Sequence, residues 1–155
     1  MKYLKLLLIL FLILLLNSCG YKKLNSEKLN DFRINKLEVD GEKKLALSIK
    51  NNIEIYSSQK SKFIYDIKIN IISSQETKIK NTSGKTTRYT TKFHVDTLIT
   101  NKDTQIVYKR TFNSTNDYDV GSTHSETLNN KKNAVENNIN YISNEIVKYL
   151  KLLNV

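Results

Sequence analysis

The sequence predicts an α+β fold, a two-layer sandwich in which a mixed four-stranded sheet carries two helices on one face. Three segments between residues 62 and 114 alternate apolar and polar residues with a period of two, as strands do. Two others, 42–57 and 128–153, repeat apolar residues every three or four positions, which is typical of helices with one buried face. A short strand precedes the first helix, so the order is strand, helix, three strands, helix.

The first two elements are this strand and the helix after it. Residues 32–39 have strand character, with Ile34, Leu37 and Val39 as apolar positions, and Asp40-Gly41 ends the strand. A strand that is joined to the next one through a helix can lie parallel to a neighbour by a right-handed crossover, which makes the sheet mixed. The apolar residues that share one face of the predicted helix are Leu45, Ile49, Ile53 and Tyr56.

Three strands follow over residues 62–74, 86–100 and 104–114, and the short turn at residues 101–103 favours an antiparallel meander. The side expected to face the helices carries Phe63, Tyr65, Ile67, Ile69 and Ile71, then Tyr89, Thr91, Phe93, Val95 and Ile99, then Ile106, Tyr108 and Phe112. The opposite side is polar and basic, with Lys68, Arg88, Lys92, His94 and Lys109.

The last element is a long amphipathic helix. Residues 116–126 are expected to form a loop, and Ser122 or Ser125 is expected to cap the helix. Its apolar stripe could be a coiled-coil seam, but an uncovered apolar sheet face favours packing onto the sheet. The stripe consists of Leu128, Val135, Ile139, Ile142, Ile146, Tyr149 and Leu153.

The amino-terminal segment has the charged, apolar, then small-residue order of a secretory signal peptide, predicted over residues 1–18. Its apolar run, residues 6–16, is shorter than the roughly 20 residues that cross a bilayer. The run ends in Leu16-Asn17-Ser18-Cys19, which resembles a lipobox and predicts that lipid is attached to Cys19. The alternative is a buried small cysteine. Cys19 is the only cysteine, so no intrachain disulfide forms.

Residues 19–30 contain few apolar residues and are expected to form a flexible tether to a single α+β domain over residues 31–155. If residues 1–18 are removed from the 155, 137 remain, which suits one core. The formal net charge is +10, and it stays strongly positive without the leader. Basic chains bind nucleic acid, acidic membranes or phosphorylated lipids, and export argues against nucleic acid.

We expect no enzyme, cofactor or metal site. Asp117, Asp119, Ser122 and His124 crowd one polar segment without the strand-to-helix turn of a catalytic nucleophile, and a turn with a helix cap explains them better. His94 and His124 are the only histidines, and they have no accompanying cluster of metal-binding side chains.

Two stretches resemble the LptE family of lipopolysaccharide-assembly lipoproteins. One is Cys19-Gly20-Tyr21-Lys22-Lys23-Leu24 at the mature start, and the other is residues 86–123, where Tyr118 matches the family's loop tyrosine. The resemblance implies a lipid-anchored protein on the periplasmic leaflet of the outer membrane. It also implies a protein that plugs the β-barrel LptD, helps the barrel to assemble and interacts with lipopolysaccharide.

The residues expected to contact lipopolysaccharide are Lys85, Arg88 and Lys92, because a basic turn adjoins a basic strand face and cations bind phosphate oxygens. The alternative is a solvated strand whose lysines only prevent edge pairing. A different class of function also remains open: a periplasm-facing lipoprotein that binds a small ligand or inhibits an envelope enzyme.

Overall fold

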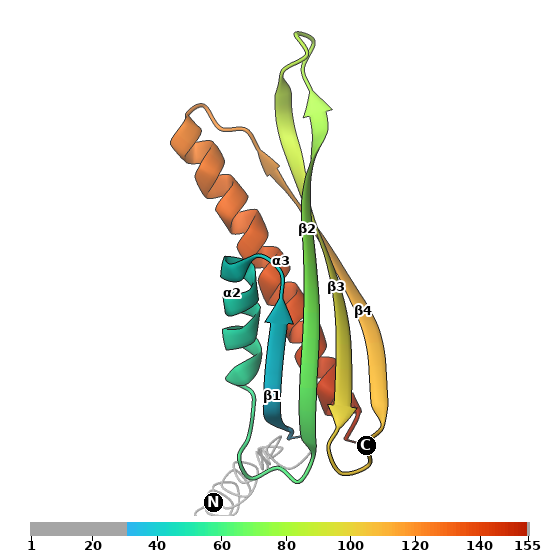
Figure 1. Cartoon of the computed structure of the whole chain (residues 1–155). Helices are drawn as coiled ribbons and strands as arrows, with labels where there is room; N and C mark the ends of the chain where they lie inside the picture. Colours follow the sequence, from blue (N-terminus) through green and yellow to red (C-terminus); the bar gives the residue numbers. More distant parts are fainter. Residues whose placement is uncertain (1–30, 155) are drawn as a thin grey trace, which may run out of the picture.

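The helices and strands follow one another in the order that the sequence predicts, and the computed structural model describes residues 31–154 (Figure 1). Two helices pack against an open, mixed four-stranded sheet, which confirms the α+β fold. The predicted signal peptide (1–18), the tether (19–30) and Cys19 lie outside the described residues. The elements are β1 (Arg33–Asp40), α2 (Lys43–Glu54), β2 (Ile64–Lys80), β3 (Thr86–Asn101), β4 (Val107–Asp119) and α3 (His124–Leu152).

The sheet has the strand order β1-β2-β3-β4, with β1 parallel to β2 and the other neighbours antiparallel. Strand β1 ends where Asp40 pairs with Asn70. The chain then leaves the sheet at Gly41, which has φ +132°, and a Cβ atom there would lie 2.7 Å from the carbonyl oxygen of Ile71. Glycine is therefore required at the turn that directs the chain from β1 into α2.

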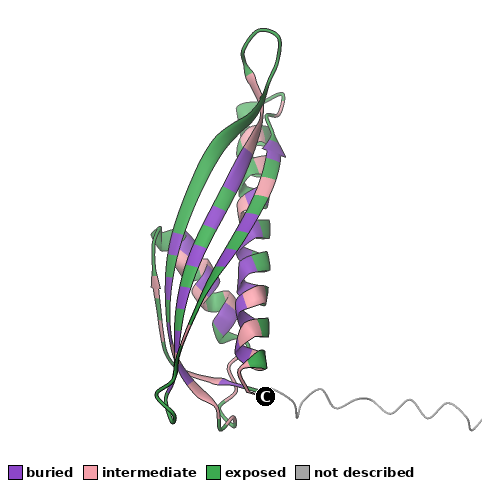
Figure 2. Ribbon diagram, turned by 90° about the vertical axis from the view of Figure 1, so that its right-hand side faces the viewer, coloured by how far each residue is buried: buried purple, intermediate pink, exposed green. Residues whose placement is uncertain are grey.

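The core lies between the sheet and the helices. Buried and exposed residues alternate along the strands, as Figure 2 shows. The face assignment from the sequence is confirmed for the two central strands, where Tyr65, Ile67, Ile69, Ile71, Phe93, Val95 and Ile99 are buried. The helices contribute fully buried isoleucines, Ile49 and Ile53 from α2 and Ile142 and Ile146 from α3.

Three residues expected on the inner side are exposed, and one of them is Tyr56, 43% exposed beyond the end of α2. Ile106 lies in the turn before β4 and is 51% exposed. Leu128 is 52% exposed because the part of α3 that carries it borders an open groove instead of the sheet core. Among the stripe residues of α3, Ile139 is the first that is buried, and Val135 before it is only partly buried against the core.

The strands are longer than the apolar pattern predicts. β2 continues to Lys80, and β4 continues to Asp119, so the predicted loop at residues 116–119 is wrong and Tyr118 is a strand residue. Both extensions consist mainly of polar residues, which carry no apolar alternation. Their backbones are held by pairing with β3, which only the tertiary fold supplies.

The helix ends also differ from the prediction. α2 ends at Glu54, so Tyr56 lies beyond it. α3 begins at His124, and its N-cap is Thr123, neither Ser122 nor Ser125. The Thr123 hydroxyl accepts a hydrogen bond from the Glu126 amide at 3.1 Å, and the Glu126 carboxylate accepts one from the Ser122 amide at 2.8 Å. Reciprocal bonds of this kind satisfy amides that the first helical turn leaves unpaired.

Candidate ligand-contact site on the β2–β3 hairpin

The β2–β3 hairpin projects beyond β1 and the core. We call residues 74–92 of this hairpin the arm (Figure 1). From Ile72 to Lys80, β2 is exposed on both faces, since β1 and α2 do not reach it. At the tip, the Asn81 side-chain oxygen accepts hydrogen bonds from the amides of Ser83 (3.1 Å) and Lys85 (2.9 Å). These bonds form an Asx-type turn that presents Lys85 to solvent.

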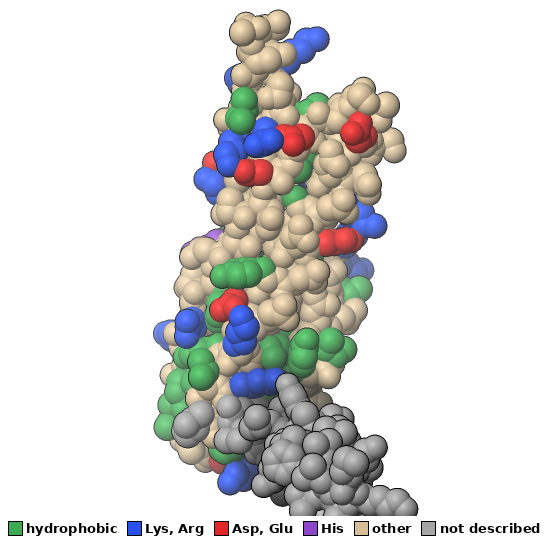
Figure 3. Space-filling model, turned by 180° about the vertical axis from the view of Figure 1, so that it is seen from behind, with side chains coloured by type: hydrophobic (Ala, Val, Ile, Leu, Met, Phe, Trp, Pro, Cys, Tyr) green, Lys and Arg blue, Asp and Glu red, His purple; other side chains and the backbone are tan. Residues whose placement is uncertain are grey.

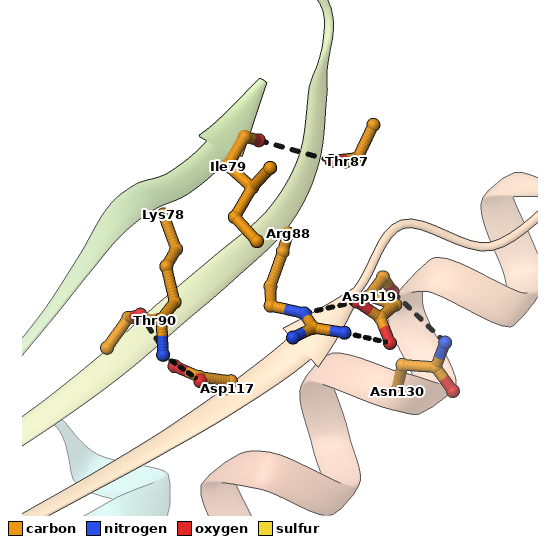
Figure 4. A network of polar contacts seen from close by, with 8 residues as sticks. All are labelled: Lys78, Ile79, Thr87, Arg88, Thr90, Asp117, Asp119 and Asn130. Atoms are coloured by element: carbon orange, nitrogen blue, oxygen red, sulfur yellow. Dashed lines mark hydrogen bonds and ion pairs between the residues drawn. The ribbon is translucent and has the colours of Figure 1, made fainter. Parts of the chain in front are cut away.

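Arg88 forms a two-pronged ion pair with Asp119 on β4, as Figure 4 shows. Its Nε lies 2.5 Å from Oδ1 and its Nη2 lies 3.1 Å from Oδ2. The hydrogen bond from Arg88 lowers the pKa of the Asp119 carboxyl group. The Asp119 carbonyl oxygen accepts a further bond from the Asn130 side chain on α3, at 3.1 Å. Arg88 is thus held at the junction of β3, β4 and α3.

A second polar group lies two residues earlier on β4, around Asp117. Lys78 forms an ion pair with Asp117, and the Thr90 hydroxyl donates to the same carboxylate at 2.7 Å. The hydrogen bond from Lys78, followed by that from Thr90, lowers the pKa of Asp117. Lys78, Thr90 and Asp117 come from three neighbouring strands, so this group connects the arm across the sheet.

Lys92 pairs with Glu76 across the hairpin, with 2.6 Å between Nζ and Oε2. Arg88 and Lys92 are four residues apart on one strand, and about 13 Å therefore separates their backbones. The predicted contact residues thus lie along one arm, with Lys85 at the tip, and two of the three are ion-paired. The sequence pattern indicated neither Lys78 nor the acidic residues as ion-pair partners, because pairing across strands depends on register.

The other face of the arm is held by aromatic stacking. Tyr89 and Tyr118 stack across β3 and β4, with 5.4 Å between ring centroids. Tyr118 is buried, and burial raises the pKa of its phenol. The residue that the family resemblance assigns to a loop is therefore part of the attachment of the arm to the sheet.

A buried polar layer lies where the arm meets the core. Asn138 of α3 is fully buried and donates from its side-chain nitrogen to the Thr91 hydroxyl at 2.8 Å. Its side-chain oxygen accepts from the Ser114 hydroxyl at 2.6 Å and from the Asn116 side-chain nitrogen at 2.8 Å. Because every polar atom of this asparagine has a partner, the layer fixes how α3 crosses β3 and β4.

An open groove of about 430 Å³ lies between the start of α2, the upper parts of β2 and β3, and α3. The charged part of its lining consists of Lys44, Lys131 and Lys132, together with Glu42 and Glu136. A groove with an apolar floor and charged neighbours suits an amphipathic ligand. Its apolar lining consists of Leu45, Phe93, Leu128, Val135 and Ile139.

Three of the four side chains considered for catalysis are bonded to other partners. Asp117 and Asp119 are ion-paired on β4, whereas Ser122 donates to Glu126 at the start of α3. On the sheet face opposite the helices, which we call the uncovered sheet face, a His94 ring nitrogen lies 2.8 Å from the side-chain oxygen of Asn113. Within residues 31–154, no three His, Cys, Asp or Glu side chains gather as a metal site would require. No helix in the same part of the chain is long and apolar enough to cross a membrane.

Comparisons with known proteins connect the chain to bacterial lipoproteins by fold. No protein-family model matches the chain, and no curated protein matches it in sequence. The crystal structure of rare lipoprotein B from Shewanella oneidensis aligns with a TM-score of 0.59 and 10% identity, over 76% of this chain and 92% of that chain. The solution structure of an uncharacterized lipoprotein B from Nitrosomonas europaea aligns with a TM-score of 0.57 and 9% identity, over 80% and 84%. At these identities the likeness establishes a shared fold.

Proposed function

We propose that the protein is an LptE-like lipoprotein of the outer membrane, attached by lipid at Cys19, that plugs and helps to assemble the β-barrel LptD and contacts lipopolysaccharide. It catalyses no reaction. The observation that carries the proposal is the fold, which the chain shares along 92% of the rare lipoprotein B structure. The lipobox-like end of the leader and the two stretches that resemble the LptE family support it.

The uncovered sheet face supports a place inside a wet barrel lumen. Its side chains bond to one another across strands, as the Thr111 hydroxyl does to Asp96 at 2.6 Å and His94 does to Asn113. A face of this kind keeps its polar groups satisfied next to water and next to the polar interior of a barrel.

The arm supports contact with a phosphorylated lipid. Arg88 and Lys92 keep 40% and 48% of their side-chain surface exposed despite their ion pairs. A lipid phosphate would share these cations with Asp119 and Glu76 or displace the carboxylates. Lys85, at the exposed tip, adds a third cation to the same arm.

The experiment is co-purification of the full chain, tagged at its carboxyl terminus, from envelopes of a bacterium that processes lipoproteins. We expect a heat-modifiable outer-membrane barrel to elute with it in mild detergent, identified by mass spectrometry. The matched control is the same chain with Cys19→Ala. A tagged protein that crosslinks to no barrel in intact cells would contradict the proposal.

Lipid attachment is tested separately. Radiolabelled palmitate is expected to enter the parent chain and not the Cys19→Ala variant, because this thiol is the only one in the chain. Label in the variant would show that attachment occurs elsewhere.

The groove favours a second candidate, a periplasm-facing lipoprotein that binds a small amphipathic ligand. Native mass spectrometry of the extracted protein would then show a bound small molecule that is lost when Val135→Trp fills the groove. A tryptophan at Asn137, an exposed neighbour on α3, is the control.

A further inference from the structure

Strand β4 forms one edge of the sheet, and no other strand of the described chain pairs with its outer side (Figure 1). At its upper end, the Val120 amide donates a hydrogen bond to the Thr87 carbonyl oxygen at 2.9 Å. Before its lower end, the Asn101 amide donates to the Ile106 carbonyl oxygen, also at 2.9 Å. The register between these two bonds is unbroken, and bonded pairs alternate with non-bonded ones in antiparallel strands. Even-numbered residues of β4 therefore bond to β3, while odd-numbered residues direct their amides and carbonyl oxygens outward.

The outer edge of β4 is open over its middle. At the upper end, the Asp119 carbonyl oxygen already accepts a hydrogen bond from the Asn130 side chain of α3, at 3.1 Å. The outward amides of Thr111, Asn113 and Thr115 have no hydrogen-bond partner within residues 31–154. These donors, each with its own carbonyl acceptor, repeat about every 6.8 Å, which is the spacing that a second extended backbone matches.

The opposite edge of the sheet, strand β1, is protected against such pairing. It has only 8 residues, and its register with β2 shifts between Ile34 and Lys36. The Ile34 amide donates to the Ser57 hydroxyl at 2.9 Å, and the exposed side chains of Lys36 and Glu38 form an ion pair. Short length, irregular register and charged side chains are the means by which proteins keep an edge unpaired.

Strand β4 lacks these protections over its middle. It has 13 residues, and its register with β3 contains no shift. The stretch from Thr111 to Asn116 contains neither a charged residue nor proline. A shallow depression of about 270 Å³ lies at this part of the edge, where Tyr141 of α3 lines it together with residues 113–116 of β4. Because Tyr141 is 53% exposed, an apolar side chain of an added strand would find an aromatic contact there.

The lower end of the same edge is apolar and basic. Ile106 and Val107 are exposed, and Lys109 and Arg110 follow them. Neither basic residue forms an ion pair within the described part of the chain. Figure 3 shows hydrophobic and basic side chains together toward this end of the molecule. An acidic residue in the added strand would complement this end.

We propose that the outer edge of β4 binds an extended segment of the barrel partner, which adds to the sheet as a further strand. The identity of the partner rests on the proposed function. Strands in the wall of a closed barrel pair with one another, so the segment belongs to a part of the partner that enters the lumen.

The chemistry of the segment follows from the two sides of the sheet. Its side chains alternate. Those on the uncovered sheet face lie beside Thr111, Asn113 and Thr115 and are polar, whereas those on the helix side include an apolar residue beside Tyr141. An acidic residue lies near Lys109.

The test removes one outward amide. Thr115→Pro loses the amide hydrogen that points away from the sheet but keeps the bonds between β4 and β3, since proline is tolerated on the outer side of an edge strand. Thr115→Val is the matched control, because it keeps both the amide and the β-branched shape. Thermal melting checks that both variants fold.

Both variants are produced as the full chain, tagged at the carboxyl terminus, in a bacterium that processes lipoproteins. We expect Thr115→Pro to recover about five- to tenfold less barrel in mild detergent than Thr115→Val, because a hydrogen bond is lost and the proline ring obstructs the added strand.

Photocrosslinking in intact cells identifies the segment without depending on the proline variant. Benzoylphenylalanine replaces Tyr141 or, as the control, Tyr56, an exposed tyrosine beyond α2. We expect the crosslink from position 141 to map to one luminal segment of the barrel protein by mass spectrometry. Thr115→Pro should remove this crosslink and Thr115→Val should retain it, while any crosslink from position 56 stays unchanged in both.

Equal recovery of the barrel with folded Thr115→Pro and with Thr115→Val overturns the proposal. So does a crosslink from position 141 to this chain itself or to a protein other than the barrel, and so does the absence of a crosslink there. In each of these cases, barrel that co-purifies with the parent chain leaves the proposed function standing. If no barrel co-purifies with the parent chain, both proposals fail.

Discussion

The core region and the arm belong to the same sheet but are stabilised by different interactions. Around α2 and the C-terminal part of α3, the layers bury isoleucine, leucine and valine side chains. In the arm, β2 is exposed on both faces, and the strands are held by ion pairs such as Arg88–Asp119 and by one tyrosine stack. Buried apolar area contributes far more to stability than exposed ion pairs. The core therefore stabilises the fold, while the arm is free to vary its surface for binding.

The largest loss of stability is expected when a charge is placed in the core. Ile142→Asp should unfold the domain, because Ile142 is fully buried and an unpaired buried carboxylate costs several kcal/mol, about 3–5 here. Thermal melting by circular dichroism checks this. Tyr141→Asp, at a 53% exposed position next to it, is the control and should melt almost as the parent does. An unchanged melt of Ile142→Asp would contradict the placement of α3.

The boundary between the two regions is tested at the buried polar layer. Asn138→Leu should lower the free energy of unfolding by about 1–3 kcal/mol, because Thr91, Ser114 and Asn116 lose their shared partner. Denaturant titration measures the loss, and Asn137→Leu at an exposed position is the control. If both variants were equally stable, the layer would contribute nothing specific.

A smaller effect is expected at the start of α3, beside the arm. Thr123→Ala removes the N-cap hydroxyl and should cost about 1 kcal/mol. Thr123→Ser keeps the hydroxyl and should retain most of the stability. Equal loss in both variants would show that the hydroxyl is not the stabilising group.

The smallest effect on stability is expected in the arm itself. Changing Lys85, Arg88 and Lys92 to glutamate should lower stability by at most about 1 kcal/mol per site, because exposed ion pairs such as Arg88–Asp119 and Lys92–Glu76 contribute little and cross-strand like-charge repulsion is of similar size. Binding to purified lipopolysaccharide should weaken at low ionic strength. The loss should shrink at about 1 M salt, where the Debye length is about 3 Å.

The control for the arm variant has the same change in net charge. Lys36, Lys50 and Lys148 are exposed and ion-paired on other surfaces, so their replacement by glutamate should leave lipopolysaccharide binding unchanged. If the arm variant binds as well as the parent at low salt, the arm is only a solvated strand pair.

The local pattern of residues was sufficient to predict the fold class and most of the core. Side chains two apart on a strand, such as Ile67 and Ile69, face the same side, and those three or four apart on a helix, such as Ile142 and Ile146, share one face. Apolar periodicity therefore predicts burial before any contact is known. It also predicted the basic strand of the arm, since Lys92 alternates with buried Phe93.

Only the tertiary structure decided what those basic residues pair with. Arg88 meets Asp119 and Lys78 meets Asp117 from positions 31 and 39 residues apart in the sequence, and such meetings depend on strand register and on the length of polar strands. Local periodicity contains no information about either, because a polar residue looks the same whether its backbone pairs with another strand or with water. For the same reason Asn138 gave no sign in the sequence that it would be buried, since its burial results from how α3 crosses β3 and β4.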